Sequence, residues 1–132
     1  MEKDNNLYKK AYSFAVDTIS LYKWICENKN EYILSKQLLR SGTSIGANIS
    51  EANGAISKAD FSAKISISYK ESLESKYWLS LLKDTGYIDN ERFHVLYNHA
   101  DELSRIMFTI LKNTRIKQST VISKQSTVIS KQ

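Results

Sequence analysis

Apolar side chains recur at every third or fourth position along most of the chain, which is the spacing that lines one face of an α-helix. The first such stretch covers residues 5–27, with an apolar face at Leu7, Ala11, Phe14, Thr18, Leu21 and Ile25. The second covers residues 31–53, with the same rhythm at Leu34, Leu38, Ser41, Ile45, Ile49 and Ala52. The polar segment Asn28–Asn30 and Gly54 predict where these two helices end.

Two further stretches with helical spacing follow. Ser57 and Asp60 have the spacing of a capping box and predict the start of a third helix, whose apolar residues are Phe61, Ile65, Tyr69, Leu73, Tyr77, Leu81 and Leu82. Gly86 ends this helix, and Asp89 or Asn90 can cap the fourth. The fourth helix carries Phe93, Leu96, Ala100, Leu103, Met107 and Ile110.

Four long helices joined by short turns pack most simply as an up-down-up-down bundle. We therefore predict an all-α fold, with a four-helix bundle over residues 5–112 and a C-terminal tail over residues 113–132. A length of 132 residues suits one domain rather than two.

The charge of the chain is concentrated in the tail. Nineteen Lys and Arg residues against 14 Asp and Glu residues give a formal charge of +5. Five bases and no acid lie from residue 112 onward, so residues 1–111 carry 14 bases and 14 acids and are formally neutral. These five bases are candidates for nonspecific contacts with nucleic-acid phosphates: Lys112, Arg115, Lys117, Lys124 and Lys131.

The tail also contains a repeat, because Lys117–Ser123 recurs as Lys124–Ser130 with the same sequence, KQSTVIS. Its β-branched residues favour extended structure over helix. We expect a frayed, flexible and solvated basic tail. The alternative is a strand that pairs between chains.

The sequence predicts a soluble cytoplasmic protein without a membrane partner. Cys26 is the single cysteine, so no disulfide can form within the chain, which favours a reducing compartment. The N-terminus has no signal-peptide core, and no apolar run approaches the roughly 18 residues of a membrane span.

The second helix has a polar row beside its apolar face, formed by Gln37, Arg40, Ser44, Asn48 and Glu51. Arg40 needs a carboxylate from another helix, for which Glu74 is the leading candidate. This row is either a satisfied network that fixes helix register or a binding surface. The second helix also carries a set of small residues, Gly42, Gly46 and Ser50. These small residues and the Tyr77–Trp78 pair predict close packing between helices or between subunits.

The second helix resembles the signature Q-L-x-R-[SA]-x-x-S-I-x-x-N-I-x-E of the bacterial four-helix-bundle family of 23S rRNA intervening-sequence proteins. Gln37–Ser41 and Ser44–Ala52 carry this resemblance. Asp60–Phe61, Glu74–Leu79 and Thr85–Ile88 extend it over roughly residues 5–112.

This resemblance implies a homo-oligomer, typically a pentamer around a central channel. The family includes relatives of the accessory protein of diversity-generating retroelements, which associates with nucleic acid and a reverse transcriptase. Most members have no assigned activity. We therefore expect a non-enzymatic oligomer that acts as a nucleic-acid-associated protein, binding RNA or DNA, or as an adaptor that binds a protein partner.

A di-iron site and a ribonuclease site are the chemical alternatives to this expectation. A di-iron bundle needs two Glu-x-x-His motifs, but the chain has one, at Glu91–His94, so we predict no metal and no cofactor. Arg92 and His99 resemble the R-x4–6-H motif of HEPN-domain ribonucleases and share a helix face. An enzyme using Arg92 to stabilise a phosphorane and His99 to transfer protons is the alternative.

Overall fold

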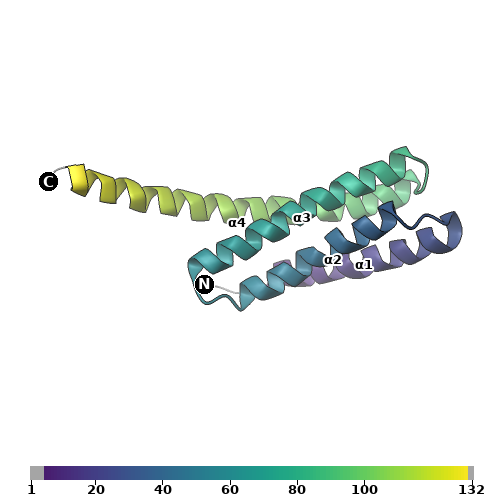
Figure 1. The fold of residues 1–132 in the computed structure, drawn as a ribbon, viewed down its shortest axis with the longest axis horizontal. Helices are drawn as coiled ribbons and strands as arrows, with labels where there is room; N and C mark the ends of the chain where they lie inside the picture. The colour runs from purple at the N-terminus through teal and green to yellow at the C-terminus, as the bar shows by residue number, and fades with distance from the viewer. Residues whose placement is uncertain (1–4, 131–132) are drawn as a thin grey trace.

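The computed structural model describes the backbone of residues 5–130 and the side chains of residues 6–114. This part of the chain forms four α-helices and no strand, which confirms the all-α prediction (Figure 1). The helices are α1 (Asn5–Lys29), α2 (Leu34–Asn53), α3 (Lys58–Asp84) and α4 (Asn90–Ser130).

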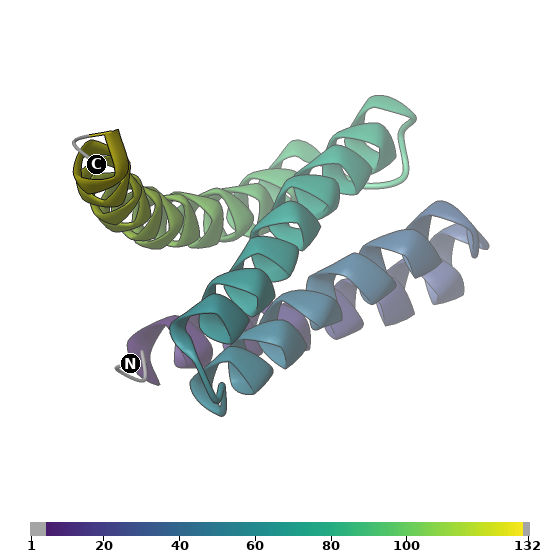
Figure 2. The same cartoon turned by 60° about the vertical axis from the view of Figure 1, so that its left-hand side comes forward.

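Each helix packs against the next, and α4 packs against α1, so the four helices form the corners of a bundle. Within the described residues, the diagonal pairs α1–α3 and α2–α4 do not approach each other. The contact between α2 and α3 is the most extensive, and that between α1 and α4 is the least. Figure 2 shows α2 lying along α1, whereas α3 starts beside the end of α2, diverges from it and passes in front of α4 in this view.

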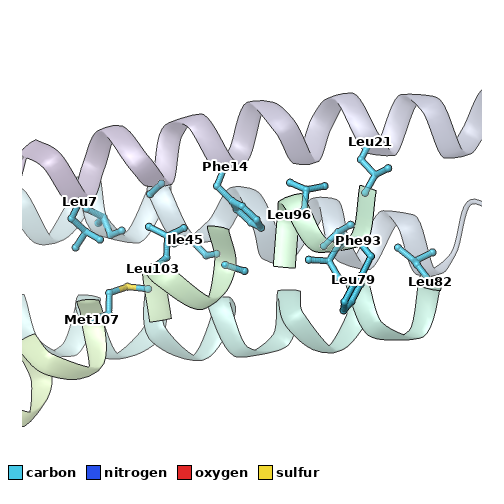
Figure 3. Close-up of a cluster of buried hydrophobic side chains, with 14 of the residues drawn as sticks. Leu7, Phe14, Leu21, Ile45, Leu79, Leu82, Phe93, Leu96, Leu103 and Met107 are labelled. Carbon is cyan, nitrogen blue, oxygen red and sulfur yellow. The ribbon is translucent and has the colours of Figure 1, made fainter. Parts of the chain in front are cut away.

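The predicted apolar faces of α1 and α4 form the core. Leu7, Phe14 and Leu21 of α1 point toward Leu96, Leu103 and Met107 of α4 (Figure 3). In α2, Leu38, Ile45 and Ile49 are fully buried. None of the described helices is apolar enough over sufficient length to cross a membrane.

The inward face of α3 differs from the prediction. Leu73 and Tyr77 are exposed, whereas serines at positions 68, 72 and 75 are fully buried. These small side chains let α2 approach closely, and their hydroxyls find acceptors without water. Ser68 Oγ donates to the carbonyl of Ile45 at 2.8 Å, and Ser75 Oγ lies 2.9 Å from Ser41 Oγ.

Helix α2 begins at Leu34 rather than at residue 31, because Glu31 caps it. The two carboxylate oxygens of Glu31 accept hydrogen bonds from the backbone N–H groups of Ile33 at 2.9 Å, Leu34 at 2.8 Å and Ser35 at 2.8 Å. Burial alone would raise the pKa of Glu31, but the N–H groups of Ser35, Leu34 and Ile33 outweigh it and hold that pKa below 4.5.

The predicted caps of the other helices are confirmed. Ser57 Oγ accepts a hydrogen bond from the N–H of Asp60 at 3.0 Å at the start of α3. Gly86 follows α3 with a φ of 85°, a backbone conformation that suits glycine. Asp89 caps α4 by accepting a hydrogen bond from the N–H of Arg92 at 2.8 Å, and that bond is the main cause of its lowered pKa.

Helix α4 continues through both copies of the repeat to Ser130, although the β-branched residues there favour extended structure. A helix that is already nucleated adds residues at little cost. Figure 1 shows this extension projecting beyond the ends of the other helices. Lys112 is exposed, and four of the predicted phosphate contacts lie outside the described side chains: Arg115, Lys117, Lys124 and Lys131.

Candidate functional site

The polar row of α2 forms one cluster with α3, centred on Arg40. The Arg40 guanidinium pairs with Glu74, as predicted, and also with Glu71 at 3.1 Å. Its Nε donates to Gln37 Oε1 at 3.3 Å, and Trp78 Nε1 donates to Glu74 Oε1 at 3.1 Å. The cluster therefore joins α2 to α3 through one cation and two carboxylates.

The rest of the polar row does not join this cluster. Ser44 Oγ donates to the carbonyl of Arg40 at 2.7 Å, and Asn48 Nδ2 donates to the carbonyl of Ser44 at 2.8 Å, so both bond within α2. Glu51 pairs with Lys64 of α3 at 3.8 Å. The side chain of Arg40 is 46% exposed, so we assign the cluster to the surface of the α2–α3 contact.

The small residues of α2 pack inside the bundle. Gly42 is buried against α1, where an added Cβ would lie 2.7 Å from Thr18 Cγ2. At Gly46 an added Cβ would lie 3.6 Å from Ala11, which is an ordinary contact. Ser50 is exposed and takes no part in this approach. Close packing of α1 on α2 thus depends on Gly42.

Helix α3 presents apolar side chains to solvent, which we call the α3 apolar face: Ile67, Leu73 and Tyr77. Tyr77 is 58% exposed. Its ring stacks edge-on against Trp78, whose side chain is half-buried against the core. Of the predicted packing pair, Trp78 therefore belongs to the bundle and Tyr77 to its surface.

Helix α1 carries a second apolar row, which was not predicted. Its members follow steps of four, three, four and three, and we call them the α1 outer stripe: Tyr8, Tyr12, Ala15, Ile19 and Tyr22. Tyr12 is 60% exposed and Ile19 is 38% exposed. Tyr8 also packs against the edge of the core. The row contains no charged residue.

Hollow surfaces lie between α1 and α4. A cavity of 420 Å³ is lined by Asp17, Trp24 and Arg92, among others. His99 lines a different cavity of 210 Å³, and its Nδ1 lies 3.8 Å from Asp17. Arg92 pairs with Asp89 at 2.7 Å. The two residues of the ribonuclease alternative therefore line separate cavities.

No group of three or more His, Cys, Asp or Glu side chains within residues 6–114 is arranged to hold a metal ion. Cys26 is half-buried, and its Sγ lies 3.8 Å from the carbonyl oxygen of Glu31. This contact ties the end of α1 to the start of α2. The Tyr22 hydroxyl lies beside the thiol, and its hydrogen bond with Cys26 raises the pKa of Tyr22.

Sequence and structure comparisons agree on the relatives of this chain. A solved protein of unknown function from the S23 ribosomal protein family of Bacteroides thetaiotaomicron is 44% identical and has a TM-score of 0.79. The match covers 80% of this chain and 98% of that one. No curated protein matches. The family model of the 23S rRNA-intervening sequence protein matches residues 3–109, and the chain therefore belongs to this family.

Proposed function

We propose that this chain is a non-enzymatic cytoplasmic subunit of a closed ring of identical bundles, which associates with nucleic acid. The observation that carries the proposal is the presence of two exposed apolar faces on diagonally opposite helices. These are the α1 outer stripe and the α3 apolar face. The pentamer implied by the family resemblance is the ring size that we propose.

Two different faces favour a ring over a simple dimer. A two-fold dimer buries the same surface on both partners, so it would leave one of the two faces exposed. A head-to-tail contact between the α1 outer stripe of one subunit and the α3 apolar face of the next buries both. Repetition of that contact closes a ring when the rotation allows it.

A mixing experiment tests this arrangement. We expect Ile19→Glu and Tyr77→Glu each to give the mass of one subunit by light scattering, because a buried unpaired carboxylate is costly. An equimolar mixture should give a one-to-one pair, because the Tyr77→Glu chain keeps its α1 outer stripe and the Ile19→Glu chain keeps its α3 apolar face. Neither chain can extend the pair.

The matched control is Asn98→Glu, which adds a carboxylate at an exposed position of α4 outside both faces. We expect this variant to keep the mass of the unmodified assembly. If the mixture of the Ile19→Glu and Tyr77→Glu chains shows no association, the head-to-tail contact is contradicted. A monomeric unmodified chain would contradict the ring itself.

Association with nucleic acid is proposed for the tail. The formally neutral body contrasts with five tail cations, and a ring would gather one set from each subunit. Such contacts are sequence-independent and weaken steeply with salt. The family description refers to 23S rRNA, so RNA is the first ligand to test.

We expect labelled single-stranded RNA to bind and to be released as salt rises. Replacing all five tail cations with glutamine should abolish this binding while the assembly mass is unchanged. Absent or salt-insensitive binding of RNA would instead favour an adaptor for a protein partner. The tail cations to replace are Lys112, Arg115, Lys117, Lys124 and Lys131.

A further inference from the structure

The contact between α1 and α4 leaves two adjoining cavities that share Trp24 and Arg92. The larger, of 420 Å³, is also lined by Asp17, Glu91 and Val95. The smaller, of 310 Å³, lies at the turn between α3 and α4 and is also lined by Lys29 and Asp89. Both volumes fall within the range of small-molecule pockets, about 300–1,000 Å³.

Trp24 and Arg92 lie against each other where the two cavities meet. The Arg92 guanidinium lies 3.9 Å from the centroid of the Trp24 ring, in cation–π contact. Asp89 also holds this guanidinium, through the 2.7 Å ion pair. Indole rings and guanidinium planes are the groups on which proteins stack unpaired nucleobases.

The two cavities differ in charge. Asp17 and Glu91 line the larger one, and ionised carboxylates accept hydrogen bonds but donate none. Glu91 forms no ion pair within residues 6–114, and Asp17 faces only His99 there. The larger cavity therefore suits a base edge that carries N–H donors.

The smaller cavity carries cations. The Lys29 ammonium lies 5.9 Å from the centroid of the Trp24 ring, so it is close to the shared surface. Lys29 and Arg92 outnumber Asp89, which leaves one net positive charge. Arginine and lysine side chains are the usual partners of phosphate.

We propose that these cavities bind one nucleotide, with its base against the Trp24–Arg92 pair and its phosphate at Lys29 and Arg92. Guanine fits best, because its pairing edge offers two adjacent N–H donors to a carboxylate such as Asp17 or Glu91. A free guanine nucleotide and a guanosine within single-stranded RNA present the same chemistry.

This site does not depend on ring formation. All of its residues come from one chain, and Trp24 and Asp17 face α4, on the other side of α1 from the α1 outer stripe. It also lies outside the basic tail. A monomeric Ile19→Glu chain should therefore bind the nucleotide as well as the unmodified chain does, which separates this inference from the proposed function.

Calorimetric titration with guanosine 5′-monophosphate tests the site in the full chain. We expect saturable binding, weakened about tenfold or more by Trp24→Leu and by Asp17→Asn. Glu27→Gln, at an exposed carboxylate of α1 outside both cavities, should leave the affinity unchanged. Uridine 5′-monophosphate should bind more weakly, because it lacks the adjacent pair of N–H donors.

A second variant separates binding from folding. Lys29 is exposed, so Lys29→Gln should leave the thermal midpoint unchanged. It should weaken guanosine 5′-monophosphate while leaving guanosine itself unaffected. Absence of saturable binding, or binding that Trp24→Leu and Lys29→Gln leave intact, would overturn the proposal.

The affinity for a short oligouridylate that ends in guanosine distinguishes the two sources, which are a free guanine nucleotide and a guanosine within single-stranded RNA. Tighter binding of this strand than of the free nucleotide assigns the site to single-stranded RNA. Tighter binding of the free nucleotide assigns it to a soluble ligand. Either result supports the site. An oligouridylate without guanosine that binds as tightly as the one with guanosine would contradict the role of the carboxylates.

Discussion

We expect Glu31→Ala to lower the free energy of unfolding by about 2–3 kcal/mol at neutral pH. The carboxylate of Glu31 accepts three backbone hydrogen bonds at the start of α2, and alanine accepts none. The N–H of Ser35 is buried and loses its acceptor outright. Water replaces part of the loss at Ile33, which is exposed, and this keeps the cost within that range.

The pH dependence of this effect follows from the lowered pKa of Glu31. A carboxyl group whose pKa is lower in the folded state stabilises the fold above its unfolded pKa, and this stabilisation disappears as pH falls through the folded value. The difference in stability between the unmodified chain and Glu31→Ala should therefore be full at neutral pH, well above the ordinary glutamate pKa, and should shrink as pH falls toward the lowered pKa of Glu31 in the folded chain.

Urea unfolding followed by circular dichroism at pH 7 and at acidic pH measures both effects. Protein concentration is held constant, since the proposed assembly would contribute to apparent stability. Glu31→Gln keeps one acceptor oxygen and should lie between the other two chains. Glu27→Ala, which removes an exposed carboxylate four residues earlier, is the control. Equal stabilities of the Glu31→Ala and Glu27→Ala chains would contradict the cap.

We expect Gly42→Ala and Gly46→Ala to change stability in opposite directions, although the glycines lie one helical turn apart. Alanine at either position gains about 1 kcal/mol of helix propensity. At position 42 the new methyl would lie 2.7 Å from Thr18 Cγ2 and 2.8 Å from Thr18 Oγ1. Overpacking of this kind costs about 1–3 kcal/mol.

Thr18 cannot relieve this clash easily. It is fully buried and β-branched, and its hydroxyl donates to the carbonyl of Phe14 at 2.8 Å. The helix-propensity gain is the same for both variants, so they should differ in unfolding free energy by the overpacking cost of about 1–3 kcal/mol, with Gly46→Ala the more stable.

The double variant Gly42→Ala, Thr18→Ala supplies the test of mechanism. Removing the Thr18 branches makes room for the new methyl, so the Gly42→Ala change should become stabilising in that background. If Gly42→Ala alone is as stable as Gly46→Ala by urea unfolding, the close approach of α1 to α2 at this point is wrong.

The fold could be predicted where apolar spacing and packing agree. Leu7, Phe14 and Leu21 of α1 lie in the core, as their spacing predicts. Helix α3 does not follow the same rule. Ser68, Ser72 and Ser75 are small enough for close contact, and each hydroxyl donates to a backbone carbonyl. Hydrophobicity alone assigns such serines to solvent.

The candidate sites were predictable only in part. The Arg40–Glu74 pair followed from the need of Arg40 for a carboxylate on another helix, and Glu71, three residues before Glu74, could have been found on the same face. The α1 outer stripe was detectable in the sequence as a second row of apolar residues with steps of three and four. The cavities at Trp24 were not, because the distance between α1 and α4 depends on how all four helices pack.

The inward serines of α3 leave larger apolar side chains on its outer face, and this affects the chain before any partner binds it. A folded subunit without partners carries Ile67, Leu73 and Tyr77 into solution, where any other protein can contact them. The hazard does not end when the chain has folded, because correct folding is what produces this surface. In the ring that we propose, the interval between folding and burial of the α3 apolar face is then the time at which the protein is most prone to aggregate.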